Sequence, residues 1–109
     1  MVNLIEQGNI IYLDFNPQRG HEQMGRRPAL VVSNDVYNRF SNLTYVCPIT
    51  STENGHPFHV ILDERTDTRG SILCEQLKAL DLEARNAIYE EKIPNDLMEE
   101  VLSLIKSFF

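Results

Sequence analysis

Short apolar runs separated by turn residues are the feature that most restricts the fold of this chain. The runs are rich in β-branched and aromatic side chains, which favour strands, and signals such as Glu53-Asn54-Gly55 and Thr68-Arg69-Gly70 separate them. The pattern predicts six strands, over residues 10–15, 29–33, 44–49, 58–62, 71–75 and 87–91. Because turn signals separate neighbouring strands, we expect the body of the protein to be mostly antiparallel β-sheet.

The C-terminal segment follows a helical period instead. Its apolar residues recur every three or four positions: Leu97, Val101, Leu104, Ile105 and Phe108. Asn95 or Asp96 can cap the start of this helix, and we expect its apolar face to pack on the sheet. Shorter helical turns are expected over residues 35–40 and 82–85.

Length and charge limit the organisation of the chain. Its 109 residues contain no internal repeat and predict one domain over residues 1–109, and an apolar fraction of 42% is high enough for a packed core. With 16 acidic residues against 10 Lys and Arg, the net charge is -6, so the chain as a whole has no field that attracts polyanions. Any nucleic-acid site must therefore be local.

Several classes of protein are not indicated. Residues 1–20 lack a basic start followed by a long apolar stretch, so we expect a cytoplasmic protein without a signal peptide or membrane anchor. Cys47 and Cys74 lie in apolar runs and are expected to be small buried hydrophobes. His56 and His59 have no further ligand pattern around them, so we expect neither a metal nor another cofactor.

The connection over residues 16–28 concentrates groups that can act on a phosphate. It contains Gly20-His21-Glu22-Gln23 and Arg26-Arg27. Histidine and carboxylate side chains can move protons, and a guanidinium can hold a phosphate through two contacts. These are the parts needed for phosphodiester cleavage, although a solvated polar loop has much the same composition.

Two further patches could complete such a site. Thr50-Ser51-Thr52 follows a predicted strand and could supply hydroxyl groups to phosphate oxygens. Glu75-Gln76-Leu77-Lys78 would, as part of a strand, put Glu75 and Leu77 on one face and Gln76 and Lys78 on the other. An ordinary Ser/Thr turn and a solvated strand are the alternative interpretations.

Taken in order, these patches resemble the toxin component of the MazF/PemK (also called Kid) type of bacterial toxin–antitoxin module. The resemblance extends over residues 8–105. The stretches that carry it are residues 8–17, Gly20-His21-Glu22-Gln23, residues 25–33, Asn38-Arg39, residues 47–51, Gly55-His56-Pro57-Phe58, residues 70–76 and residues 80–85.

The resemblance implies a fold, an activity and partners. The fold would be an SH3-like antiparallel β-barrel with short helices and a C-terminal helix packed on the sheet, working as a homodimer. The activity would be metal-independent, sequence-specific cleavage of single-stranded RNA, in particular mRNA, which inhibits translation and growth. Attack by the 2′-hydroxyl would leave 2′,3′-cyclic phosphate and 5′-hydroxyl ends. A cognate antitoxin with an acidic, disordered tail would compete with RNA for the same few arginines.

The resemblance also implies site residues. The essential arginine and threonine of the family match Arg27 and Thr50, for stabilising the charge on the phosphate and for orienting it. The candidates for proton transfer are His21, Glu22 and Glu75. The candidates for contacts to RNA bases and backbone are Gln23, Ser51, Gln76 and Lys78. One branch uses an arginine two residues before the acidic position, where this chain has Leu73, so a mechanism that needs that arginine is not expected here.

Two other functions remain open from the sequence. The same fold is shared by the CcdB type of toxin, which poisons DNA gyrase by contact and needs no catalytic arginine and threonine. An SH3-like module that only binds its target would also fit the fold.

Overall fold

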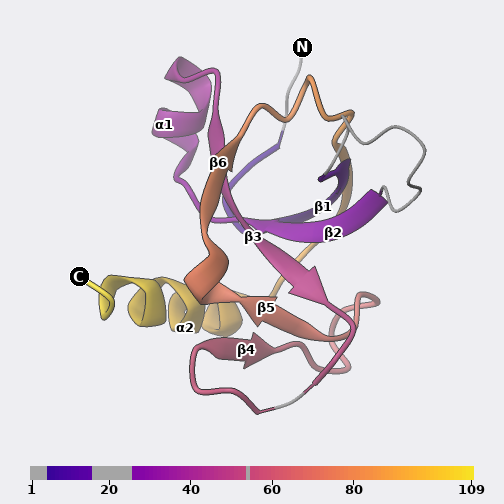
Figure 1. Cartoon of the computed structure of the whole chain (residues 1–109), viewed down its shortest axis with the longest axis vertical. Coiled ribbons are helices and arrows are strands. Elements are labelled where there is room, and N and C mark those ends of the chain that lie inside the picture. Colours follow the sequence, from indigo (N-terminus) through magenta and orange to yellow (C-terminus); the bar gives the residue numbers. More distant parts are fainter. Residues whose placement is uncertain (1–4, 16–25, 54) are drawn as a thin grey trace.

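A mainly antiparallel sheet with two helices forms the protein, and it is known from a computed structural model (Figure 1). The structure describes residues 5–15, 26–53 and 55–109. The elements in chain order are β1 (Asn9–Asp14), β2 (Arg26–Val31), α1 (Asp35–Phe40), β3 (Thr44–Thr50), β4 (His59–Ile61), β5 (Ser71–Leu73), the 3-10 helix η1 (Cys74–Gln76), β6 (Lys78–Leu80), β7 (Ile88–Lys92) and α2 (Asn95–Lys106). The predicted antiparallel strands and C-terminal helix are confirmed.

The strands follow the order β4-β5-β3-β2-β1-β7, and β6 pairs with β3 beside this path. Within the described residues, β4 and β7 are the two ends of the path and do not pair, so hydrogen bonds do not close the sheet into a complete barrel. β3 is the central strand, since β2, β5 and β6 all pair with it. Figure 1 shows β6 crossing the view alongside β3, and α1 lying far from α2.

The strand predicted over residues 71–75 ends two residues early. Continuing the register of β5 would pair Val46 with Glu75, but β6 pairs Val46 with Lys78 instead. The registers in which β5 and β6 pair with β3 differ by three residues, and the 3-10 helix η1 lies between the two strands, where the register changes. Glu75 and Gln76 therefore lie on η1, and the predicted strand alternation of residues 75–78 is wrong.

The core is divided between the two faces of the sheet. The larger cluster includes Ile10, Leu30 and Ile72 together with the buried face of α2, and the smaller cluster includes Val31 and Val46 on the opposite face. Removing this apolar surface from water stabilises the fold by about 25 cal/mol per Å². Both cysteines are buried without a disulfide in the larger cluster, as expected.

Of the two predicted short helical turns, the one over residues 35–40 is confirmed as α1. Asn34 caps α1 by accepting a hydrogen bond from the Tyr37 N–H at 2.8 Å. The cap residue of α2 is Pro94, whose carbonyl accepts from Leu97 and Met98, so a cap by Asn95 or Asp96 is wrong. Residues 82–85 form hydrogen-bonded turns and no helix. None of the described helices is long and apolar enough to cross a membrane.

Candidate functional site

The two residues expected to be essential lie near the start of β2 and at the end of β3. The strands pair from Val31 with Val46 to Ala29 with Pro48, and Arg27 and Thr50 each lie two residues beyond this last pair. Because residues two apart in a strand share a face, Arg27 lies on the face of Ala29 and Thr50 on the face of Pro48. β2 begins at Arg26, so both arginines belong to a strand and not to the connection assigned to residues 16–28.

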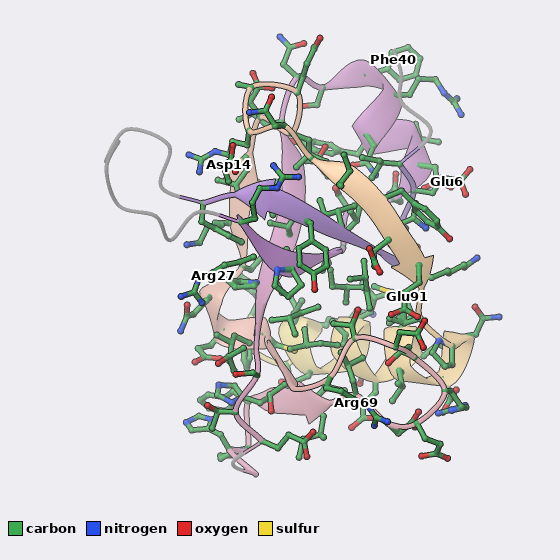
Figure 2. All side chains as sticks on the ribbon, turned by 90° about the vertical axis from the view of Figure 1, so that its right-hand side faces the viewer. Glu6, Asp14, Arg27, Phe40, Arg69 and Glu91 are labelled. Carbon is green, nitrogen blue, oxygen red and sulfur yellow. The ribbon has the colours of Figure 1, made fainter. Side chains whose placement is uncertain are left out.

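A cleft of about 410 Å³ opens beside the start of β2, and Arg27 lines it whereas Thr50 does not. Its walls combine apolar, hydroxyl and charged side chains: Tyr12, Arg26, Arg27, Pro28, Ile49, Ser51, Asp67, Thr68 and Arg69. Figure 2 shows Arg27 at the end of the sheet and Arg69 on the turn below it. Three arginines against one aspartate make the cleft a local basic site on an acidic protein.

The three arginines are not equally available to a ligand. Arg26 donates to Asp14 Oδ1 and to the Tyr12 carbonyl, each at 3.1 Å. The Asn86 amide, with help from the Arg26 guanidinium, keeps the pKa of Asp14 below its usual range. Within the described part of the chain, the side chains of Arg27 and Arg69 form no hydrogen bond or salt bridge. The hydrogen bonds from Arg65 chiefly, and the charge of Arg69 in addition, lower the pKa of the Asp63 carboxyl. Neither Arg27 nor Arg69 is hydrogen-bonded to a described carboxylate, so both guanidinium groups can contact an anion.

Close packing of backbone against backbone explains why Arg69 reaches this cleft. Gly70 has φ of +120°, and a Cβ atom built on it would lie 1.9 Å from the carbonyl oxygen of Thr50. Only glycine fits this contact, so the turn before it is held against the end of β3. Arg69 thereby lines the same cleft as Ser51.

Glu75 lies apart from the lining of the cleft, in a pair with a histidine. Its Oε2 atom is 3.2 Å from Nε2 of His59, whose side chain is only 8% exposed. Partial burial raises the pKa of Glu75, but hydrogen bonds from His59 and the backbone outweigh it and the pKa lies below its usual value. The His59 ring also stacks on His56, with 4.3 Å between centroids.

The remaining candidates are dispersed or outside the described residues. Gln76 is exposed on η1 and does not line the cleft. The Lys78 ammonium lies 5.4 Å from the centre of the Phe15 ring, a cation–π distance, on the face that carries the smaller core cluster. His21, Glu22 and Gln23 lie outside the described residues. Within the described ranges, no group of three or more His, Cys, Asp or Glu side chains could hold a metal ion.

Sequence reasoning missed Arg69 and His59 as site candidates. The Thr68-Arg69-Gly70 motif was recognised only as a turn, and nothing in it says which strand the turn packs against. The contact follows from the pairing of Thr50 with Ser71, which a single sequence does not reveal. His59 was considered only as a metal ligand, although its position in β4 opposite Leu73 brings it to Glu75.

Comparison with known protein families and curated proteins gives consistent matches. Residues 6–109 match the family described as PemK-like, MazF-like toxin of type II toxin-antitoxin system. The chain is 36% identical over 107 residues to Endoribonuclease PemK of Escherichia coli, covering 94% of this chain and 80% of that protein. It is 34% identical over 102 residues to Endoribonuclease toxin MazF of Escherichia coli strain K12, covering 94% and 87%.

Solved structures show the same similarity. MazF from Deinococcus radiodurans superposes with a TM-score of 0.85 and 37% identity, covering 98% of this chain and 97% of that one. The MazE-MazF structure from the same organism gives a TM-score of 0.84 and 32% identity, covering 98% and 96%. The similarity therefore includes the whole sheet and both helices.

Proposed function

This chain belongs to the PemK-like, MazF-like toxin family of type II toxin–antitoxin systems, and from that premise we propose that it is an endoribonuclease whose catalytic centre is the Arg27–Thr50 strand end. The observation that carries the proposal is the Arg27 guanidinium, which lines the basic cleft and has no hydrogen bond or salt bridge among the described residues. Single-stranded RNA, in particular mRNA, is the proposed substrate. The relatives named endoribonuclease support this choice.

The chemistry needs little from the protein because RNA carries its own nucleophile. The 2′-hydroxyl attacks the adjacent phosphorus, the bond to the 5′-oxygen breaks, and the products are a 2′,3′-cyclic phosphate and a 5′-hydroxyl. Arg27 would stabilise the negative charge that builds up on the phosphate oxygens, and the Thr50 hydroxyl would orient that phosphate. No metal takes part in this scheme.

Two protons must move, one from the 2′-hydroxyl and one to the 5′-oxygen. Of the three candidates, Glu75 is the described one, and His59 holds its carboxylate. Since the pKa of Glu75 lies below its usual value, Glu75 is ionised at neutral pH and could accept a proton but not donate one. His21 and Glu22 remain our candidates for the other transfer.

Contacts to the RNA outside the reacting phosphate are assigned by side-chain chemistry. Ser51 lines the cleft and can donate to a phosphate oxygen. Gln23, Gln76 and Lys78 are proposed to contact bases or backbone, as amides and ammonium groups do on unstacked RNA. With a net charge of -6, binding would depend on a few local cations and weaken strongly with salt.

The family also suggests an assembly and a regulator. We propose that the protein acts as a homodimer in the cytoplasm and that an antitoxin with an acidic, disordered tail neutralises it by covering the basic cleft. The MazE-MazF structure of a similar protein supports an antitoxin partner. A tail of opposite charge would be attracted to Arg27 and Arg69.

The test is incubation of purified protein with a long labelled single-stranded RNA, and with the matching DNA, in excess EDTA. Arg27→Ala protein purified in parallel reveals contaminating nuclease. We expect discrete RNA fragments ending in cyclic phosphate, and intact DNA. Intact RNA combined with toxicity in cells would instead favour a toxin that poisons gyrase, and RNA binding without cleavage would favour an inactive binding module.

A further inference from the structure

Both carboxylate oxygens of Glu91 on β7 accept hydrogen bonds from the turn over residues 65–70, which forms one wall of the cleft. Its Oε1 atom accepts from the Asp67 N–H at 3.0 Å. Its Oε2 atom accepts from both the Thr68 N–H and the Thr68 hydroxyl, each at 2.7 Å. Asp67, Thr68 and Arg69 all line the cleft. Figure 2 shows Glu91 above the turn that carries Arg69.

A β-bulge is what directs Glu91 toward this turn. Along β1, Ile10 pairs with Glu91 whereas Ile11 pairs with Tyr89, so Glu90 is the extra residue. Ile10 and Ile11 belong to the core clusters on opposite faces of the sheet. The bulge therefore puts Glu91 and Tyr89 on opposite faces, although residues two apart in a regular strand share a face. Without it, the carboxylate would point away from the turn.

Two further sets of contacts hold this turn in place. Arg65 binds Asp96 on α2 through two contacts of 2.9 Å. The Gly70 carbonyl accepts from the Leu62 N–H at 2.8 Å, and Gly70 itself packs on the Thr50 carbonyl. Glu91 is the anchor directly before Arg69, through the N–H groups of Asp67 and Thr68.

We propose that Glu91 is a positioning residue that fixes the Asp67–Thr68 backbone, so that Arg69 is presented to a phosphate next to the one that Arg27 holds. The proposal rests on the proposed function, because it concerns how the same cleft binds RNA. Glu91 touches neither the RNA nor the reacting atoms. Its effect is on binding of the strand and not on the chemical step.

The test compares Glu91→Gln with Glu90→Gln, a matched control. Both change one carboxylate of β7 to an amide, but Glu90 is exposed and makes no hydrogen bond to the turn. We expect Glu91→Gln to raise KM for a short RNA by roughly three- to tenfold with kcat nearly unchanged. The salt dependence of binding to a non-cleavable 2′-O-methyl RNA should weaken by about 0.7 in log–log slope, one lost phosphate contact on a single strand.

Arg69→Ala keeps the test decisive if Glu91→Gln unfolds the protein. Arg69 is exposed and forms no hydrogen bond or salt bridge among the described residues, so this variant should fold normally. It should reproduce the rise in KM and the loss of slope, and Glu91→Gln should add no further effect in the Arg69→Ala background. Unchanged KM and slope in Arg69→Ala would overturn the proposal, as would a Glu91→Gln protein that matches Glu90→Gln.

The same experiment separates this proposal from the proposed function. If wild-type protein does not cleave RNA under any condition while it binds or poisons another target, the proposed function fails. If wild type cleaves RNA and Arg69→Ala cleaves it with the same KM, only the role of Glu91 fails.

Discussion

Arg27 lies near the start of β2, lines the basic cleft and has no hydrogen bond or salt bridge among the described residues. An arginine without a salt bridge adds little to folding, since even exposed ion pairs contribute only about 0–1 kcal/mol. Its position therefore favours a role with an anionic ligand. Replacing Arg27 should therefore lower the rate of cleavage without lowering the stability of the fold.

Arg27→Ala is expected to lower kcat by about a hundredfold or more, because a fixed donor to the charge of the transition state is lost. The melting temperature should change little, because the side chain is exposed. Single-turnover cleavage of a short RNA and thermal melting measure the two effects. Arg39→Ala on α1 removes an equal charge away from the cleft, and it should leave kcat unchanged.

The lowered pKa of Glu91 predicts how the stability of the protein changes at acid pH. Burial raises the pKa of Glu91, but the donors from Asp67 and Thr68 outweigh it, so the folded-state pKa lies below the usual glutamate value. The stabilisation is therefore fully present above about pH 4.3, and it is lost as pH falls through the lower folded value.

Glu91→Gln should destabilise the protein by about 2 kcal/mol at neutral pH, the scale of hydrogen bonds to a charged group. Urea denaturation across the acid range measures this, and the difference from wild type should shrink as pH falls. A difference that stays constant down to the lowest pH would show that the carboxylate charge is not the cause.

At the scale of elements, the contact between the turn before β5 and the end of β3 holds the cleft together. Gly70→Ala would force a Cβ atom against the Thr50 and Ser51 backbone, at 1.9 Å from the Thr50 oxygen. We expect a loss of about 2 to 4 kcal/mol, from overpacking and strain at positive φ. Chemical denaturation measures the loss, and cleavage should also fall because Thr50 moves.

Gly55→Ala is the control for Gly70→Ala. Gly55 also has positive φ, at +68°, but an added Cβ would meet no atom of the described residues within 4 Å. It should cost only about 1 kcal/mol, the strain of the left-handed conformation. Equal losses in the two variants would mean that packing against Thr50 contributes nothing.

The elements that sequence reasoning predicted best are those with a strong local pattern. Strands with β-branched runs, such as β1 and β3, and the amphipathic α2 were predicted close to their observed bounds. β6 was missed, because Lys78–Leu80 is a three-residue strand that pairs, among the described strands, with β3 alone. The 3-10 helix η1 was also missed. It lies where the chain changes register between two pairings with β3, and a local pattern does not reveal such pairings.

The candidate site was predictable to a similar degree. Arg27 and Thr50 were identified from the sequence, and the structure places them near the start of β2 and at the end of β3. Their catalytic roles stay a prediction. Nothing in the local sequence marks Arg69 or Glu91 as a site residue. Arg69 reaches the cleft because Gly70 packs against Thr50, and Glu91 faces the turn because of the β-bulge in β7. Tertiary contacts of this kind are absent from a local pattern.

At the scale of the whole molecule, an acidic protein that binds RNA must do so with few cations. If Arg27 and Arg69, the two cleft arginines without a salt bridge among the described residues, each contact a phosphate, the log–log slope of RNA affinity against salt should be about -1.4. Fluorescence anisotropy with a 2′-O-methyl RNA measures it. A slope near zero would exclude phosphate binding in the cleft, and a much steeper one would require a second basic surface.

The central claim is that the Arg27–Thr50 strand end cleaves RNA through the 2′-hydroxyl of the RNA itself. The most direct measurement uses a short RNA with one cleavage site and the same RNA carrying a single 2′-deoxy nucleotide at that site, both in excess EDTA. We predict that wild type cuts the first and leaves the second intact, and that Arg27→Ala cuts neither at a comparable rate. Equal cleavage of both RNAs, or full activity of Arg27→Ala, would contradict the account.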